Sequence, residues 1–251
     1  TVRAKVTLIE QAKMGGDCLN TGCVPSKTLI RAARLAHEMR TADRYGLTPA
    51  NPPVPFERVM ARVREAIRII EPADSAERYT GLGVDVRQGH ATIVDPWTVA
   101  IDGEKRLTTR SIVIAAGGEP VVPDIPGLEE SGYLTSDTLW DALGERASVP
   151  ERIVVIGGGP IGCELSQAFA RLGSQVVQVE GGDRIMARED AEVSAFVADA
   201  LRADGVDLRL GSKAARVDGK TLVLSDGSSV PFDELIVAVG RHARLGGYGL
   251  E

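Results

Sequence analysis

The amino-acid sequence predicts an α/β fold built from two related units, and three observations indicate this. Short apolar strands alternate with amphipathic helices, which is the pattern of a parallel sheet covered by helices. Glycines gather where strands end, and they make up 28 of the 251 residues, well above the roughly 7% of ordinary domains. Two segments recur: VTLIE (6–10) matches VVQVE (176–180), and the stretch from Ser111 matches the one from Glu234.

The first half of the sequence predicts strands and two amphipathic helices. The first strand ends at Glu10, and the helices span about residues 25–40 and 56–70, on either side of a proline-rich connection. Further strands are expected over residues 84–88, 91–94, 98–101 and 112–116, the last of them buried.

The second half is more regular. A glycine turn at 157–162 leads into a helix that ends at about Leu172, and a second helix covers 191–203. A hairpin is expected over 214–224. Strands are expected over residues 152–156, 175–179, 206–210 and 235–239.

Composition and charge exclude several functions. The chain has 29 Lys and Arg against 35 Asp and Glu, and no basic run stands out, so we expect neither a nucleic-acid nor a membrane partner. The longest apolar runs are far too short to span a bilayer. Three cysteines cannot build a disulfide framework, and no signal peptide opens the chain, so we expect a cytoplasmic location.

The motif Gly157-x-Gly159-x-x-Gly162 follows a predicted strand and opens a predicted helix, and Glu180 ends the next strand. This is the context of a Rossmann-like dinucleotide-binding unit. The three glycines permit the tight turn, the approach of the pyrophosphate and close helix packing, in that order. The alternative is a glycine-rich turn that binds no ligand.

Glu180 predicts which dinucleotide binds. A carboxylate there accepts hydrogen bonds from both ribose hydroxyls and repels a 2′-phosphate, so NAD(H) is preferred over NADP(H). Arg184 would soften this preference.

Cys18 and Cys23 lie directly before the first predicted helix. A helix N-terminus lowers a thiol pKa, and two cysteines at this spacing can close a small disulfide ring, so we favour a redox pair. Inert structural thiols and half of a metal site are the alternatives. No metal is expected, because the other candidate ligands lack paired spacing. They are His37, His90, Cys163 and His242.

Three nearby residues have ordinary interpretations when taken alone. Lys27 would be a solvated lysine, and Glu164 a carboxylate in the first turn of the nucleotide-binding helix. Cys163 would be a small apolar filler.

The two units also differ. The second glycine turn begins 23 residues before Glu180, and the same spacing before Glu10 lies ahead of Thr1. We therefore expect the opening strand and phosphate loop of the first unit to lie outside this sequence.

At this point the residues resemble a known family. GGDCLNTGCVPSK (15–27) closely resembles the redox-active segment of the FAD-dependent pyridine nucleotide-disulfide oxidoreductases, in the branch of dihydrolipoamide dehydrogenase and mercuric reductase, and the resemblance covers the whole chain. It implies an incomplete FAD domain at 1–121, a complete NAD(P) domain at 122–245, and a return into the FAD domain at 246–251. Each domain would be Rossmann-like with a small antiparallel β element.

The resemblance implies roles for individual residues. Cys18 would be the thiol that attacks the substrate and Cys23 the thiol that meets the flavin, while Lys27 would lie near flavin N5 and pair with Glu164. The FAD site would include Glu10 on the adenosine ribose, Gly16, Ala91 on the adenine side, Ala116 and Gly117. The NAD site would include Gly157, Gly159, Gly162, Glu180, Val217 and Gly240.

The resemblance further implies an NAD(P)H-dependent enzyme, whose electrons pass through FAD to the Cys18–Cys23 disulfide and then to an acceptor. The acceptor would be lipoamide, another small-molecule or protein disulfide, or a metal ion, and the parent protein would be a homodimer. The dimerisation domain and the C-terminal part of the flavin site would lie outside this sequence. We therefore expect FAD in the parent rather than in this chain alone, and no turnover by this chain.

Two departures from the family pattern stand in the chain: Asp17 replaces a threonine, and the usual Ala-Thr-Gly strand end reads Ala-Ala-Gly at 115–117. The main alternative function is an NAD(H)-binding module without turnover. The remaining alternative is an α/β fragment that binds nothing.

Overall fold

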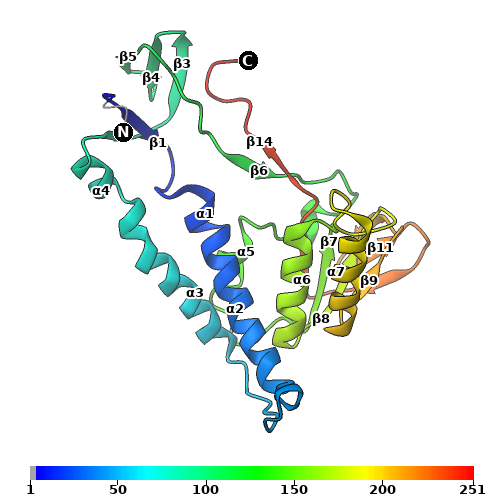
Figure 1. Cartoon of the computed structure of the whole chain (residues 1–251). Coiled ribbons are helices and arrows are strands. Elements are labelled where there is room, and N and C mark those ends of the chain that lie inside the picture. Colours follow the sequence, from blue (N-terminus) through cyan, green and yellow to red (C-terminus); the bar gives the residue numbers. More distant parts are fainter. Residues whose placement is uncertain (1–3) are drawn as a thin grey trace.

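The computed structural model describes residues 4–251 as a mixed α/β fold. Three helices pack side by side, with α2 (Cys23–Arg40) between α3 (Phe56–Ile70) and α6 (Pro160–Leu172) (Figure 1). Arg40 at the end of α2 donates a hydrogen bond to the carbonyl of Arg171 near the end of α6. The two helices therefore begin at the same end of the pair.

A four-stranded parallel sheet forms the centre of the second half. Its strand order is β13-β7-β8-β9, and every neighbouring pair is parallel. The strands are β7 (Arg152–Ile156), β8 (Gln175–Val179), β9 (Asp207–Arg209) and β13 (Glu234–Val237). Helices α6 and α7 (Ala191–Ala203) connect β7 to β8 and β8 to β9. These elements confirm the expected ones to within one or two residues at their ends; β9 is one residue shorter at each end, and β13 ends two residues before the expected end at 239.

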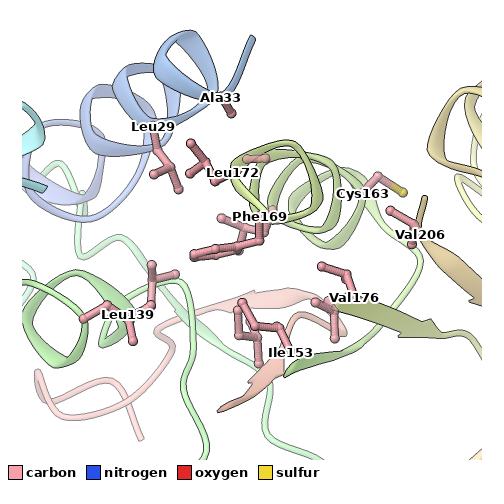
Figure 2. Packing of buried hydrophobic residues seen from close by; sticks show 14 of the residues in the cluster. Leu29, Ala33, Leu139, Ile153, Cys163, Phe169, Leu172, Val176 and Val206 are labelled. Carbon is pink, nitrogen blue, oxygen red and sulfur yellow. The ribbon is translucent and has the colours of Figure 1, made fainter. Parts of the chain in front are cut away.

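Strand β7 is buried on both faces, as the central strand of a covered parallel sheet should be. Ile153 and Val155 belong to the cluster beneath α6, whereas Val154 and Ile156 belong to a second cluster on the opposite face. Figure 2 shows the first cluster, where Phe169 points from α6 into the space between the helices and the sheet. Phe169 is fully buried and its ring lies 6.4 Å from that of Phe56.

The second cluster lies under a three-stranded antiparallel sheet with the order β10-β11-β12. Its strands are β10 (Ala214–Asp218), β11 (Thr221–Leu224) and β12 (Ser229–Pro231). The first two form the expected hairpin.

The first half holds a parallel pair and a second antiparallel sheet. Strand β1 (Thr7–Glu10) pairs with β2 (Asp85–Gln88), and β3, β4 and β5 form the antiparallel sheet. These three strands are β3 (Ala91–Asp95), β4 (Thr98–Ile101) and β5 (Lys105–Thr108). Farther along the chain, β6 (Gly118–Pro120) pairs with β14 (Arg241–Ala243), which brings the end of the chain back to the first half (Figure 1).

The expected buried strand at 112–116 is wrong for this structure. Residues 111–117 have no assigned strand, and the side chains of Val113 and Ile114 are 87% and 51% exposed. A strand needs a neighbour to satisfy its backbone groups. Among residues 4–251, no segment pairs with 112–116.

Several short elements were not predicted from the sequence. They are α1 (Gly16–Asn20), α4 (Ala76–Gly81), α5 (Leu139–Ala142) and the short 3₁₀ turns at Ala42–Tyr45, Glu71–Asp74 and Glu129–Ser131. Strands β5, β6, β12 and β14 were also missed. No helix within residues 4–251 combines the length and apolar character needed to cross a bilayer.

A buried carboxylate joins α2 to the second half. Asp204, at the end of α7, contacts His37 of α2 at 3.2 Å, Arg171 at 2.9 Å and Gln167 at 2.7 Å. Burial lowers the pKa of His37 below its ordinary value, and neighbouring arginines add to this effect while Asp204 opposes it. The neutral form of the histidine is therefore favoured over the charged form.

Candidate functional site

The glycine turn between β7 and α6 has the geometry expected of a dinucleotide-binding turn. Gly157 has φ of 120°, and a Cβ there would overlap the carbonyl oxygen of Ala238. A Cβ on Gly162 would overlap the carbonyl oxygen of Gly157, so only glycine allows the helix to pack this close. Space is open at Gly159, which precedes the first residue of α6. The open position leaves room for a pyrophosphate at the helix N-terminus.

Glu180 lies directly after β8 and reaches back to the same turn. One carboxylate oxygen accepts a hydrogen bond from the N–H of Gly158 at 2.6 Å, and the other accepts one from Gly182 at 2.7 Å. The carboxylate is thus fixed beside the turn, where a ribose would lie next to a bound pyrophosphate.

A buried amide supports the turn from below, and sequence reasoning missed it. The Nε2 group of Gln178 donates to the carbonyl oxygen of Gly157 at 2.9 Å and contacts the Cys163 sulfur at 3.6 Å. A polar residue inside the apolar strand VVQV was the available signal. Burial raises the pKa of the Cys163 thiol, so this cysteine is an inert core residue, as predicted.

Of the two other residues expected at the NAD site, one is buried and the other is exposed. Val217 is buried in the cluster under the antiparallel sheet, with its N–H donating to the carbonyl of Pro126. Gly240 is exposed with φ of 135° and accepts a hydrogen bond from the N–H of Val121. Only its backbone is available to a ligand.

The two expected redox cysteines lie at consecutive helix starts. Cys18 is in the first turn of α1, and Cys23 is the first residue of α2, two residues before the predicted start. The carbonyl oxygen of Asp17 accepts hydrogen bonds from the N–H groups of Thr21 at 2.9 Å and Gly22 at 2.5 Å. This turn, residues 17–22, folds the chain back so that the two exposed thiols are neighbours; we call it the cysteine turn.

The expectation of a lowered thiol pKa is wrong for Cys18. Its pKa is raised, first because its thiol hydrogen-bonds to Cys23 and second because of burial. Lys27 opposes the shift weakly. The thiolate form of Cys18 is therefore disfavoured relative to an ordinary cysteine.

Lys27 and Glu164 are brought to neighbouring helices but not into contact. Both side chains are exposed, on α2 and α6, and no ion pair joins them. Glu164 is the fifth residue of α6, so it lies in the second helical turn and not in the first as expected.

The residues expected at the FAD site are all partly or fully exposed. Glu10 ends β1 and accepts one hydrogen bond from the N–H of Ala12 at 2.7 Å, while Gly16 has φ of 56° with open space around it. Ala116 and Gly117 are exposed, and Ala91 begins β3. These residues offer a ribose-binding carboxylate and accessible backbone, which fit one side of a flavin nucleotide.

Two side chains from the second half hold the cysteine turn, and sequence reasoning missed both. Arg241 contacts Asp17 at 2.7 Å and Asp137 at 2.6 Å, and it also donates to the carbonyl of Gly118 at 2.9 Å. The indole N–H of Trp140 donates to the carbonyl of Thr21 at 2.7 Å. Asp17 and Arg241 are 224 positions apart, so no local pattern indicated the contact.

A metal centre is not formed by the described part of the chain. Within residues 4–251, no three or more His, Cys, Asp or Glu side chains gather as a metal-binding group.

The chain matches known proteins along its length. Residues 2–249 match the family model described as pyridine nucleotide-disulphide oxidoreductase. A mercuric reductase of Lysinibacillus sphaericus is 35% identical over 245 residues, covering 95% of this chain and 44% of the relative. A dihydrolipoyl dehydrogenase of Thermus scotoductus is 34% identical over 259 residues, covering 98% of this chain and 54% of the relative. The chain thus spans about half the length of these relatives, which are oxidoreductases.

Solved structures agree with this assignment. The Cu(II) complex of RclA, an HOCl-induced flavoprotein disulfide reductase of Escherichia coli, superposes with a TM-score of 0.81 at 26% identity. The match covers 98% of this chain and 53% of RclA. LpdA of Mycobacterium tuberculosis has the same fold, with a TM-score of 0.81 at 24% identity. The chain belongs to the pyridine nucleotide-disulphide oxidoreductase family of flavoproteins.

Proposed function

We propose that this chain carries the electron-transfer segments of an NAD(P)H-dependent disulfide oxidoreductase. One observation carries the proposal: α2, which begins at Cys23, packs along α6, which begins at the glycine turn, and both helices start at the same end. A thiol pair and a dinucleotide turn are thereby presented on one side of the molecule. We place the domain boundaries at 121/122 and 245/246, as expected from the sequence.

The second half binds the reductant in this proposal. The N–H groups at the start of α6 and the open position at Gly159 hold the pyrophosphate. The carboxylate of Glu180 accepts hydrogen bonds from the ribose hydroxyls, and its negative charge disfavours a 2′-phosphate. NAD(H) is therefore the preferred dinucleotide.

The first half accepts the electrons. A Cys18–Cys23 disulfide takes up two electrons and two protons and becomes two thiols, and reoxidation passes the electrons to an acceptor. In the dithiol, the pKa of Cys18 is raised, first by its hydrogen bond with Cys23. Glu10, Gly16, Ala91, Ala116 and Gly117 would border FAD, which when bound supplies a two-electron relay between the nicotinamide and the disulfide. Lys27 would place a positive charge near it.

The acceptor is a small-molecule or protein disulfide, or a metal ion, in this proposal. The named relatives act as mercuric reductases and dihydrolipoyl dehydrogenases, which are consistent with either class. We further propose a cytoplasmic location and a homodimeric parent protein.

The visible absorption spectrum of the chain, purified without added cofactor, tests flavin binding. A flavin band that bleaches on addition of NADH supports the whole electron path. A colourless protein that still binds NADH supports the second candidate, an NAD(H)-binding module without turnover. That candidate is favoured by the contrast between the four-stranded sheet of the second half and residues 111–117, which pair with no segment among residues 4–251.

Calorimetric titration with NADH and NADPH tests the dinucleotide site. Glu180→Gln keeps the side-chain size but removes the charge, so we expect the preference for NADH over NADPH to fall about tenfold, because a charged hydrogen bond contributes about 1.5–3 kcal/mol. Glu145→Gln is the matched control, since that side chain is 91% exposed and lies outside the site. An unchanged preference in Glu180→Gln would contradict the ribose role.

A further inference from the structure

The cysteine turn is held at both of its ends by side chains of the second half. The turn closes where the carbonyl of Asp17 accepts hydrogen bonds from Thr21 and Gly22. Outside contacts reach the same two positions, because Arg241 binds the carboxylate of Asp17 and Trp140 binds the carbonyl of Thr21.

Arg241 is the more extensively bonded of the two. Its guanidinium contacts Asp17 at 2.7 Å through one nitrogen and Asp137 at 2.6 Å through the other, with further bonds to Ser136 and to the carbonyl of Gly118. The side chain of Arg241 is 26% exposed, that of Asp137 is 25% exposed and that of Asp17 is 51% exposed, so the contact with Asp137 is the less screened of the two. One guanidinium thus connects Asp17, the residue before Cys18, to the loop that precedes α5.

Trp140 lies in α5, which follows this loop directly. Its side chain is buried, and its indole N–H is shared between the carbonyls of Thr21, at 2.7 Å, and Ser136, at 2.8 Å. Residues 136–140 are therefore linked to both ends of the cysteine turn. Arg241 joins Asp137 to Asp17 at the start of the turn, and Trp140 contacts Thr21 near its end.

We propose that Arg241 and Trp140 are positioning residues that hold the cysteine turn in the shape in which Cys18 and Cys23 form a disulfide. The inference rests on the proposed function of the thiol pair and adds the residues that tune it. Fixing the backbone of a residue costs conformational free energy. A turn that is already ordered in the dithiol does not lose that freedom on oxidation, so the disulfide is favoured.

The equilibrium that reports this effect is exchange with dithiothreitol. The protein dithiol and cyclic oxidised dithiothreitol give the Cys18–Cys23 disulfide and reduced dithiothreitol, with two electrons and two protons passing between the two couples. Releasing the turn lowers the equilibrium constant for protein oxidation.

Three substitutions in the full chain test the proposal. We expect Asp17→Asn and Arg241→Gln each to lower the oxidation constant about tenfold, because each removes a charged contact. Trp140→Phe keeps the ring but removes the indole N–H, and we expect a loss of about threefold. Asp17→Glu retains the carboxylate and should restore part of the loss. The disulfide fraction is measured by mass spectrometry of alkylated peptides across a series of dithiothreitol ratios.

The matched control is Arg152→Gln. Arg152 pairs with Asp233 at 2.7 Å and is 43% exposed, but it lies at the start of β7 and does not contact the cysteine turn. We expect this variant to lose stability in chemical denaturation without changing the oxidation constant. If the oxidation constant only followed the stability of the fold, Arg152→Gln would lower this constant as well, and that result would overturn the proposal.

The outcomes distinguish the proposed redox function of the thiol pair from the positioning role of Arg241 and Trp140. If the wild-type chain forms no Cys18–Cys23 disulfide at any ratio, the proposed redox function fails, and the positioning role fails with it. If the wild type forms the disulfide and Asp17→Asn and Arg241→Gln leave its constant unchanged, only the positioning role is overturned.

Discussion

Two regions of this molecule have the same sequence pattern and different structures. The segment ELIVAVG (234–240) contains strand β13, whose four residues are all buried against β7. The matching segment SIVIAAG (111–117) contains no strand, and Val113 is 87% exposed. Apolar residues alone therefore do not make a strand. The partner strand that satisfies the backbone does.

The other pair of matching segments shows the same dependence on partner strands. VVQVE (176–180) contains β8, which lies between β7 and β9 and buries Val176 and Val179. VTLIE (6–10) contains β1, which pairs with β2 alone and has no buried side chain. The two glutamates at the ends of these strands nevertheless have similar settings, because Glu10 and Glu180 both accept a hydrogen bond from a backbone N–H two residues later.

The largest effect should come from the core beneath α6. Phe169→Ala removes a fully buried ring and should lower the free energy of unfolding by about 3–5 kcal/mol, by loss of apolar burial and formation of a cavity. Val113→Ala in the matching half should change it by less than about 0.5 kcal/mol. Urea denaturation measures both. Equal losses would show that residues 111–117 are packed in solution, which would break the comparison.

The glycine turn should separate folding from binding. Gly162→Ala places a methyl group against the carbonyl oxygen of Gly157, so we expect a loss of about 1–3 kcal/mol in stability together with weaker NADH binding. At Gly159 the space is open and φ is −76°, so Gly159→Ala meets no clash and should cost only about 0.5–1 kcal/mol of stability, from the loss of a glycine N-cap, and still weaken NADH binding. Denaturation and calorimetry on both variants are required. Normal NADH binding by Gly159→Ala would argue against a pyrophosphate at this turn.

The sequence predicted the elements whose signals are local. The helix at 191–203, the hairpin at 214–224 and the glycine turn were all readable from periodicity, turn residues and helix ends. The failures had non-local causes. The strand at 112–116 lacks a partner among the described residues, and the pKa of Cys18 depends on its contact with Cys23.

The contacts of Arg241 and Trp140 with the cysteine turn were unpredictable for the same reason. They join residues that are more than 100 positions apart in the chain, and neither side chain belongs to a recognisable motif. The site residues could be named from the sequence, whereas the residues that position them required the structure.

The smallest effect on stability should come from the titration of His37, which lies where α2 meets the second half. The pKa of His37 is lowered from 6.5, mainly by burial, so the unfolded chain takes up its proton before the folded chain does. Stability from this group is present above pH 6.5 and is lost as the pH falls through the lowered value. His37→Gln should therefore flatten the fall in stability between pH 7 and pH 5, by less than about 1 kcal/mol. A steeper fall in the variant would reverse the assigned sign.

The placement of Trp140 gives the protein an optical reporter of its own. Trp97 and Trp140 are the two tryptophans of the chain, and the first is 61% exposed whereas the second is 8% exposed. Iodide in solution will therefore quench the emission of Trp97 and leave that of Trp140. The indole N–H of Trp140 donates a hydrogen bond to the carbonyl of Thr21, two positions before Cys23. We therefore expect the emission that iodide does not quench to change with the oxidation state of Cys18 and Cys23, without an added dye.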